Sequence, residues 1–208
     1  AYMYTGIDLF AKAIYMAPKI VDYLLDVFEK YVYIHCKIWT EYNFGPAFFI
    51  GEDIAFGSGL MFSERWLKKH VFPRHKRIIA LLKKKGIKYI FHSDGNLNSI
   101  LDYLVNELRI DALNPIEPAA GMDIKVVKEK YGDRIALIGN IDCSELLPMG
   151  SPEEVAAVTK KTIEIAAPGG GFCIGSSSEL HDLVPVENAL ALHKTAEKYG
   201  RYPIRAVR

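Results

Sequence analysis

The chain is poor in cysteine and has no cysteine pair at metal-binding spacing. Cys36, Cys143 and Cys173 are its three cysteines in 208 residues, and none of them belongs to a CxxC motif. A disulfide-stapled secreted fold needs a dense set of cysteines, and a zinc knuckle needs four closely spaced ligands. The sequence therefore argues against both classes and predicts a protein of the reducing cytoplasm.

Net charge and long apolar runs are also missing. The 26 Lys and Arg residues nearly balance the 25 Asp and Glu residues, so there is no basic excess of the kind that nucleic-acid binding requires. The longest apolar runs, such as residues 47–50, are far shorter than the roughly 20 residues that span a bilayer. The first residues, AYMYTG, contain neither an initiator methionine nor a signal peptide. We expect a cytoplasmic protein that binds neither nucleic acid nor membrane.

Half of the residues are hydrophobic, which is enough for a sizeable core. Apolar residues between Ile20 and Trp39 recur at spacings of three and four and predict a helix over 19–41, with His35 on its buried stripe. After a short apolar strand at 47–50 and a glycine-rich turn, a helix pair divided at Pro73 is expected.

Strand and helix signals then alternate to the end of the chain. With no hairpin signal between them, five strand-helix units predict an α/β protein with a parallel sheet and right-handed crossovers. A capping box, SPEE at 151–154, fixes the start of one helix. The expected strands are 88–92, 112–113, 135–138 and 171–175, and the helices are 97–108, 122–131, 152–166 and 186–199.

Polar residues occupy every loop that follows a predicted strand, whereas the loops that return from helix to strand have fewer candidate binding or catalytic side chains. In parallel sheets and barrels the carboxyl ends of the strands face one another and bind the ligand. We therefore expect one shared pocket. Its candidate lining residues are Glu52, Asp53, His92, Asp94, Asn96, Asn114, Glu117, Asn140, Asp142, Ser177, Ser178 and His181.

Some of these residues also fit a purely structural role. Asp and Asn are common helix N-caps, so Asp94, Asn96 and Asp142 could each serve only as a cap. His92 and Asp94 lie on one face of an extended segment and could both bind a metal. Because zinc takes three or four ligands, we predict no metal site, with His92 and Asp94 as weak candidates.

The ordered set of loop motifs resembles the uroporphyrinogen decarboxylase superfamily, whose members are (β/α)8 barrels. No single motif is specific, but the set is, and the similarity runs over nearly the whole chain. The matching segments are GEDIA (51–55), FSE (62–64), FPRHKRI (72–78), FHSDGN (91–96), LIGNID (137–142), GGG (169–171), HDLVPVEN (181–188) and KYGRYP (198–203).

The resemblance implies a partial barrel, with about the last five of the eight βα units present. It predicts one domain over residues 1–208 that lacks the N-terminal units of the family, in agreement with the abrupt start at AYMYTG. The arginine-bearing segment that receives substrate carboxylates in the decarboxylases has no counterpart here. Five units alone would leave two sheet edges unpaired, so either the first units lie outside this sequence or a second chain covers the gap.

Two branches of the superfamily compete for the function. The decarboxylases remove acetate carboxylates from a tetrapyrrole without metal or organic cofactor. For this branch the resemblance makes Asp53, His92 and Asp94 the acid-base candidates and the other loop residues substrate-binding. Tyr2 looks like the decarboxylase active-site tyrosine. Ser177 or Ser178 stands where the last-loop histidine is expected, with His181 nearby.

The other branch moves a methyl group to or from a corrinoid, and many members hold zinc with His-x-Cys and a later cysteine. His92 matches the first ligand, but Asp94 stands at the first cysteine, and serines stand at the second. Cys173 precedes the position of the second cysteine ligand and lies inside a predicted strand. Because zinc activation of a thiol relies on soft thiolate ligands, the missing sulfurs count against that version. A corrinoid methyltransferase that protonates through Asp or Glu stays open.

We predict a uroporphyrinogen-decarboxylase-like enzyme that decarboxylates a tetrapyrrole by acid-base chemistry. The alternative is a corrinoid-dependent methyltransferase of the same superfamily, and the second alternative is a non-catalytic barrel fragment. Decarboxylation needs no cofactor, whereas methyl transfer needs a corrinoid and in some members zinc. The expected partners are a tetrapyrrole or corrinoid ligand, a corrinoid protein for methyl transfer, and a second copy of the chain if the protein is a homodimer.

Overall fold

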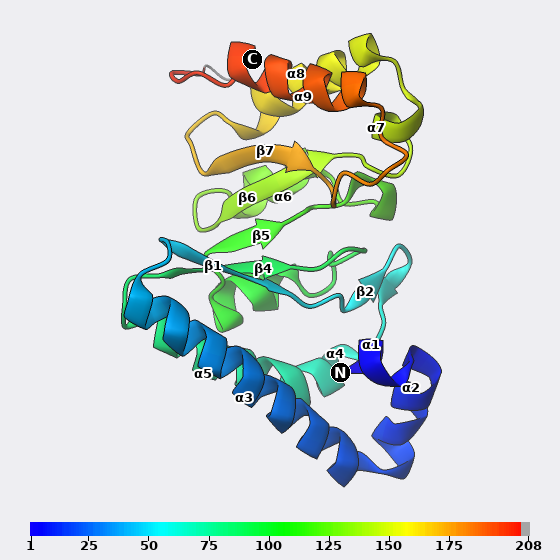
Figure 1. Cartoon of the computed structure of the whole chain (residues 1–208), viewed down its shortest axis with the longest axis vertical. Helices are drawn as coiled ribbons and strands as arrows, with labels where there is room; N and C mark the ends of the chain where they lie inside the picture. The colour runs from blue at the N-terminus through cyan, green and yellow to red at the C-terminus, as the bar shows by residue number, and fades with distance from the viewer. Residues whose placement is uncertain (205–208) are drawn as a thin grey trace. The chain divides into compact units, whose positions relative to one another are not determined.

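A computed structural model describes residues 1–204 (Figure 1). Its internal contacts divide the chain into two compact units, which are described separately. Unit 1 comprises residues 1–49 and 62–89, and unit 2 comprises residues 50–61 and the chain from 90 onward. Among the described residues, no helix combines the length and the apolar character that a bilayer crossing requires.

Five strands form the main sheet in the order β1-β4-β5-β6-β7, so sheet neighbours follow one another along the chain. The pairs from β4 to β7 are parallel. Lys88 N donates to Pro46 O and Glu52 N to His92 O, and these bonds advance in the same direction along both segments, as in a parallel pair. The strands are β1 (Ala47–Gly51), β4 (Lys88–His92), β5 (Ala112–Asn114), β6 (Ala136–Ile141) and β7 (Phe172–Ser176).

This order confirms the predicted α/β class and matches the last part of a (β/α)8 barrel. In unit 2 the strands alternate with helices close to the predicted positions. Helix α8 starts with the expected capping box, in which Ser151 N donates to the Glu154 carboxylate at 2.7 Å. The helices of this unit are η2 (Tyr103–Leu108), η3 (Pro118–Ala120), α6 (Ile124–Tyr131), α7 (Leu146–Met149), α8 (Pro152–Ala166) and α9 (Val186–Tyr199).

A small hairpin follows β1 that the sequence analysis did not expect. Strand β2 (Ala55–Phe56) pairs antiparallel with β3 (Gly59–Leu60), and Gly57 and Ser58 make the turn. A glycine followed by a polar residue between two short apolar segments is a two-residue hairpin signal. The hairpin lies against the loop after β4, because Asn96 N donates to Phe56 O at 2.9 Å.

Unit 1 consists mainly of helices. Its core cluster is formed by Phe10, Val21 and Leu25, and Tyr2, Phe62 and Trp66 are among the partly buried side chains packed against it. The Tyr2 and Phe62 rings lie 6.2 Å apart. The helices are α1 (Tyr2–Thr5), α2 (Ile7–Met16), α3 (Pro18–Tyr42), α4 (Glu64–Trp66), η1 (Leu67–Val71) and α5 (Phe72–Lys83), so Pro73 lies in the first turn of α5.

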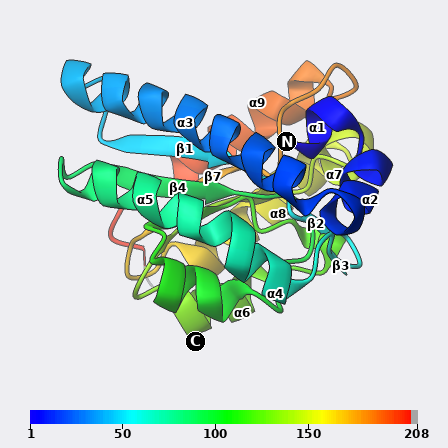
Figure 2. The same ribbon diagram turned by 90° about the horizontal axis from the view of Figure 1, so that it is seen from below.

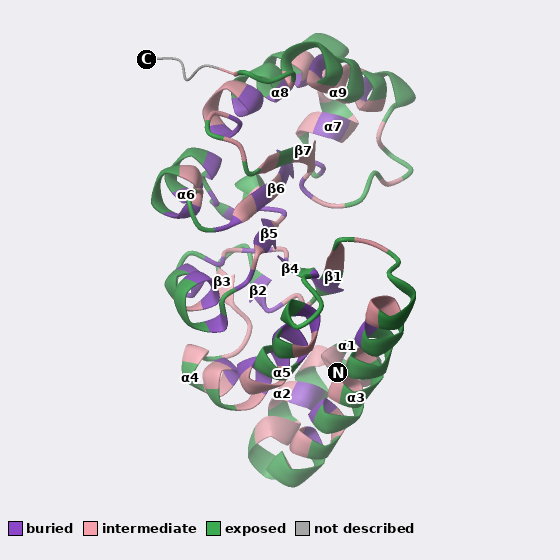
Figure 3. Cartoon of the chain, turned by 90° about the vertical axis from the view of Figure 1, so that its left-hand side faces the viewer, coloured by how far each residue is buried: buried purple, intermediate pink, exposed green. Residues whose placement is uncertain are grey.

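Helix α3 buries a different face from the one predicted (Figure 3). Val21, Leu25 and Cys36 are its buried residues, whereas Ile20 is 60% exposed. The prediction of His35 as a core residue is wrong, since the ring is exposed and its Nδ1 contacts Tyr31 O at 2.8 Å. Apolar residues occur on several faces of α3, so spacing alone did not identify the buried one.

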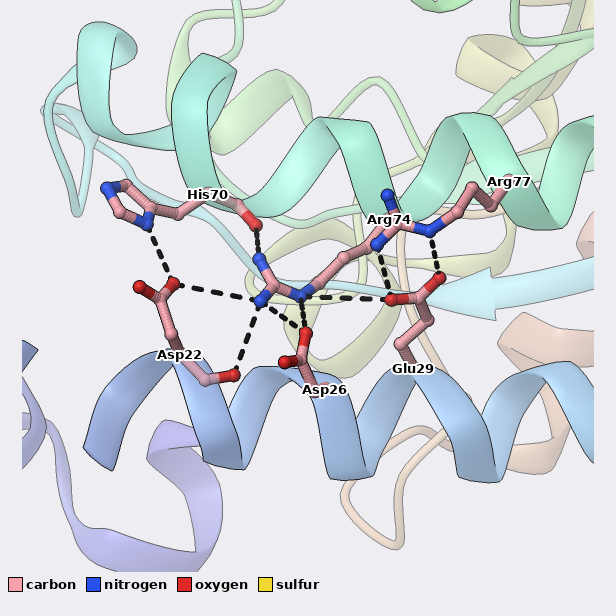
Figure 4. Close-up of polar contacts among 6 residues, drawn as sticks. All are labelled: Asp22, Asp26, Glu29, His70, Arg74 and Arg77. Atoms are coloured by element: carbon pink, nitrogen blue, oxygen red, sulfur yellow. Dashed lines mark hydrogen bonds and ion pairs between the residues drawn. The ribbon is translucent and has the colours of Figure 1, made fainter. Parts of the chain in front are cut away.

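Helix α3 of unit 1 runs beside η1 and α5, and ion pairs join it to both (Figures 2 and 4). Arg74 donates to Asp26 through Nε at 3.0 Å, Arg77 donates to Glu29 through Nη2 at 2.6 Å, and His70 Nδ1 lies 2.9 Å from Asp22 Oδ1. Each pair is separated by 48 residues. This constant offset means that the two helices run in the same direction, as successive crossover helices do. We call this set the salt-bridge seam: Asp22, Asp26, Glu29, His70, Arg74 and Arg77.

Candidate functional site

Three titratable side chains from two loops of unit 2 meet in space. His92 is the last residue of β4, Asp94 follows it two residues later, and Asp53 lies two residues after β1. His92 Nε2 lies 3.7 Å from Asp53 Oδ1 and 3.8 Å from Asp94 Oδ1. We call these residues the acid-histidine cluster. Their nitrogen and oxygen atoms all lie within 4.8 Å of one another.

Backbone contacts hold the two loops of the cluster together. Asp94 N donates to Asp53 Oδ1 at 3.1 Å, and Ile54 N donates to Ser93 Oγ at 3.1 Å. Gly95 has a φ of +88°, and a Cβ there would lie 2.5 Å from the backbone of Ala55. Only glycine permits this approach without strain, so the glycine of HSDGN is needed to bring Asp53 and Asp94 together. No local pattern in the sequence predicts this requirement, because Ala55 is distant from Gly95 along the chain.

Asn114 fixes the orientation of His92. The two residues are direct neighbours in the β4-β5 register, and Asn114 Oδ1 lies 2.5 Å from His92 Nδ1. Asn114 Nδ2 donates to Ile138 O at 3.3 Å, which leaves Oδ1 facing the ring. Because an amide oxygen only accepts, Nδ1 carries the hydrogen. In the neutral ring, Nε2 therefore presents a lone pair to the two carboxylates.

The electrostatic surroundings of Asp94 disfavour its charged form. Burial is the main cause of its raised pKa, and the carboxylates of Asp53 and Glu117 raise the pKa further, whereas His92 and a hydrogen bond from Ser178 lower it. No lysine or arginine is among these influences in the described part of the chain. Asp94 Oδ1 is buried and has no hydrogen-bond partner among residues 1–204. The cluster therefore gathers three carboxylates that His92 compensates only in part.

Six predicted site residues thus lie together in unit 2. Glu117 joins the cluster because its Oε2 accepts from Gly95 N at 2.6 Å. Glu52 contacts this region only through its backbone in the described bonds, with Glu52 N donating to His92 O at 2.8 Å, and is not counted among the six. The six are Asp53, His92, Asp94, Asn114, Glu117 and Ser178.

Asn96 and Asp142 bond to backbone amides of their own loops. Asn96 Oδ1 accepts from Asn98 N at 3.0 Å. The Asp142 carboxylate accepts from Ser144, Glu145 and Leu146 N–H groups at 2.8 to 3.1 Å, at the start of α7. Both side chains thereby make the local contacts that a capping role requires, and substrate binding by them stays a prediction.

The last loop ties itself to the loop after β6. Ser177 Oγ accepts from Cys143 N at 3.0 Å and lies 3.3 Å from Cys143 Sγ. His181 Nδ1 accepts from Leu183 N at 3.3 Å, so Nε2 carries the hydrogen and donates to Cys143 O at 3.0 Å. With both ring nitrogens engaged, His181 holds the loop in place.

Asn140 faces a separate cavity. Its Nδ2 donates to Ile116 O at 2.7 Å, and its side chain is buried. With Asp142 it lines a cavity of about 430 Å³ whose other walls are largely apolar, and no acid-histidine cluster residue lines it. The predicted residues therefore divide between two places in unit 2, while Tyr2 belongs to the core cluster of unit 1.

The donor set of the cluster does not fit a thiolate zinc site. Cys36 lies in unit 1, where burial raises the pKa of its thiol to about 12, and Cys143 contacts Ser177. The group of potential metal ligands contains one histidine and two aspartates and no cysteine. Their ligand atoms are nitrogen and oxygen, which suit a cation that does not require sulfur.

Comparisons with known proteins identify the family of the chain. The sequence is similar to the Methylcobamide:CoM methyltransferase MtbA of Methanosarcina acetivorans, with 24% identity over 163 residues, which cover 76% of this chain and 46% of that protein. It is also similar to the methylated-thiol–coenzyme M methyltransferase of Methanosarcina mazei, with 23% identity over 186 residues, 89% of this chain and 47% of that protein. The chain thus spans about half the length of these relatives.

A solved structure shares the fold. A methyltransferase from Methanosarcina mazei matches with a TM-score of 0.76 and 19% sequence identity over 94% of this chain and 54% of its own. The sequence model of the family named Uroporphyrinogen decarboxylase (URO-D) matches residues 1–199. The chain belongs to the uroporphyrinogen decarboxylase family.

Proposed function

We propose that this chain forms part of a corrinoid-linked methyltransferase, with the acid-histidine cluster next to the methyl acceptor. The names of the similar proteins support methyl transfer over decarboxylation, because they act on methylcobamide, methylated thiols and coenzyme M. The expectation of tetrapyrrole decarboxylation from the sequence motifs has no comparable support among these relatives. The chain would contribute the carboxyl-end loops of β1, β4 and β5 to the site.

The charge of the cluster is the observation that carries this proposal. A decarboxylase must hold the carboxylates of its substrate with cations. Here Asp53, Asp94 and Glu117 surround one another, and no lysine or arginine acts on Asp94 in the described part of the chain. Such surroundings repel an acidic tetrapyrrole. The same carboxylates do not repel a neutral methyl group, or a small uncharged acceptor such as a thiol that loses its proton on methylation.

Methyl transfer gives the residues of the cluster a clear task. A methylcobamide supplies an electrophilic methyl group, whose bonding electron pair stays with cobalt while an acceptor lone pair forms the new bond. The acceptor must then lose its proton. His92 Nε2 and Asp94 Oδ1 are two basic atoms that lie 3.8 Å apart. General acid-base assistance of this kind contributes about 10²- to 10⁴-fold to rates.

The test is a direct comparison of two substrates on the purified 208-residue chain. One arm supplies methylcobalamin with a panel of small thiols, following the loss of the cobalt-methyl absorbance and the methylated thiol by mass spectrometry. The other arm supplies a uroporphyrinogen and follows carboxylate loss. We expect methyl transfer that His92→Ala slows by about 10²-fold or more. Decarboxylation without methyl transfer, or methyl transfer unchanged in His92→Ala, would overturn the proposal.

A further inference from the structure

The cavity that Asn140 faces is a second candidate binding site in unit 2. It lies at the start of α6 and beside α7 and α8, and its volume of about 430 Å³ is within the range of small-molecule pockets. Met122 and Ile124 in its walls are buried, whereas Asp123 and Val158 are exposed to solvent. A small molecule can therefore enter from solvent and contact apolar side chains inside.

Two buried polar side chains in the cavity wall have oxygens without a hydrogen-bond partner. Asn140 is 7% exposed, and its Nδ2 donates to Ile116 O, but its Oδ1 accepts no hydrogen bond from residues 1–204. Thr162 is 6% exposed, and its hydroxyl makes no hydrogen bond within the same residues. Because buried polar groups in folded proteins nearly always have a partner, a ligand or water must supply the donor for Asn140 Oδ1.

The other polar side chains of the cavity are carboxylates. Asp123 and Asp142 line it, and the lining residues in the described chain include no lysine, arginine or histidine. The Asp142 carboxylate accepts backbone N–H groups at the start of α7, and Asp123 Oδ1 accepts from Lys125 N at 2.8 Å. The cavity therefore offers a ligand hydrogen-bond acceptors and negative charge, and no side-chain cation.

We propose that this cavity binds a small organic cation, an alkylammonium whose N–H groups face Asn140 Oδ1 and the carboxylates. Hydrogen bonds between an ammonium and a carboxylate are stronger than those between neutral groups. The alkyl part would lie against Met122, Ile124 and Leu146, which removes apolar surface from water. The carboxylates would repel an anion. No residue of the acid-histidine cluster lines the cavity, so the inference does not depend on methyl transfer.

Three probes of equal carbon number test the inference on the purified chain without any assay of activity. The probes are n-pentylammonium, 1-pentanol and pentanoate. The measurement is the chemical shift of the methyl groups of Ile124, Leu146 and Val158, which line the cavity, in an NMR titration. We expect n-pentylammonium to bind with a Kd of about 1 mM or lower. 1-Pentanol should bind at least about tenfold more weakly, and pentanoate should not bind.

Two pairs of variants locate the bound cation. Val158→Trp should abolish binding, because the larger side chain fills the cavity from a position that is 39% exposed. Val126→Trp on α6 is its control, since Val126 is 54% exposed and does not line the cavity. Asp123→Asn should weaken n-pentylammonium binding by up to about fivefold and leave 1-pentanol binding unchanged, while asparagine still caps α6. Glu129→Gln, at an exposed carboxylate of α6 outside the cavity, should change neither.

Circular dichroism of each variant confirms folding, and the comparison of probes on the wild type keeps the test valid if Val158→Trp unfolds. Equal binding of n-pentylammonium and 1-pentanol would overturn the inference, because the cavity would then not distinguish charge. Two other results would also overturn it. One is the absence of methyl shifts with every probe, which would leave water as the partner of Asn140 Oδ1. The other is n-pentylammonium binding that persists in folded Val158→Trp.

Discussion

The salt-bridge seam of unit 1 and the acid-histidine cluster of unit 2 both join carboxylates to a histidine but differ in charge balance. In the seam, carboxylates of Asp22, Asp26 and Glu29 face one imidazole and two guanidinium groups. In the cluster, Asp53 and Asp94 face His92, and Glu117 adds a further negative charge. The seam is close to neutral, whereas the cluster has an excess of negative charge.

This difference in charge balance indicates a structural role for the seam and a functional role for the cluster. A paired surface charge contributes little to stability, commonly 0 to about 1 kcal/mol, and fixes how two helices align. A half-buried carboxylate without a matching cation lowers stability, so it is retained where chemistry requires it. We therefore expect variants of the seam to change stability and variants of the cluster to change activity.

The two histidines provide the sharpest comparison. His92→Ala should lower the methyl-transfer rate by about 10²-fold or more, because it removes a basic atom of the cluster. His70→Ala in the seam should leave the rate unchanged and lower the free energy of unfolding by at most about 1 kcal/mol. Parallel rate assays and urea unfolding of both variants check this. Equal loss of rate in both would remove the distinction between the regions.

The approach of the two cluster loops depends on Gly95. Gly95→Ala should destabilise the chain by roughly 1 to 3 kcal/mol, because alanine is strained at a φ of +88° and its Cβ would lie 2.5 Å from the Ala55 backbone. It should also lower the methyl-transfer rate by separating Asp53 from Asp94. Gly57→Ala in the hairpin turn is the control, since no atom lies within 4 Å of a Cβ there. Urea unfolding with indistinguishable midpoints for the two variants would show that the close approach is unimportant.

The two arginines of the seam should contribute differently to the free energy of unfolding, and the more buried one should contribute more. Arg74 is 15% exposed and donates to Asp26, to Asp22 O and to His70 O, whereas Arg77 is 55% exposed. Arg74→Met should cost about 1 to 2 kcal/mol of unfolding free energy. Arg77→Met should cost 0 to about 1 kcal/mol. Denaturant titration of both variants measures which one loses more unfolding free energy. A larger loss for Arg77→Met than for Arg74→Met would contradict the prediction.

The smallest effect concerns the pH dependence of stability. Burial and the neighbouring carboxylates raise the pKa of Asp94 in the folded state. A carboxyl group with a raised folded pKa loses stability as the pH rises from its unfolded pKa to its folded pKa, because ionisation becomes easier in the unfolded chain. Asp94→Asn removes this pH-dependent loss. The free energy of unfolding of the variant, relative to that of the wild type, should therefore increase as the pH rises above about 4. A pH-independent difference in urea midpoints would contradict the assignment.

Local signals in the sequence predicted much of the fold. Helices 152–166 and 186–199 and strand 88–92 match the structure in both bounds, because caps and apolar periodicity are properties of neighbouring residues. The buried face of α3 was predicted wrongly because it depends on what packs against the helix. The hairpin at 55–60 was missed because its strands are only two residues long.

The candidate site was harder to predict than the fold. Asp94, Asn96 and Asp142 all follow strands, and residue type does not separate them. The latter two bond to amides of their own loops, whereas Asp94 faces Asp53, which is distant in sequence. The motifs also did not separate the two branches of the family. They favoured decarboxylation, whereas the similar proteins are methyltransferases.

The central claim, that the acid-histidine cluster is a functional centre and the seam a structural one, is tested most directly by a pair of matched aspartate variants. The measurement is the initial rate of methyl transfer from methylcobalamin to a small thiol by Asp94→Asn and Asp26→Asn, each compared with the wild type. Our account predicts a loss of about 10²-fold or more for Asp94→Asn and none for Asp26→Asn. Wild-type activity in Asp94→Asn, or an equal loss in both variants, would contradict it.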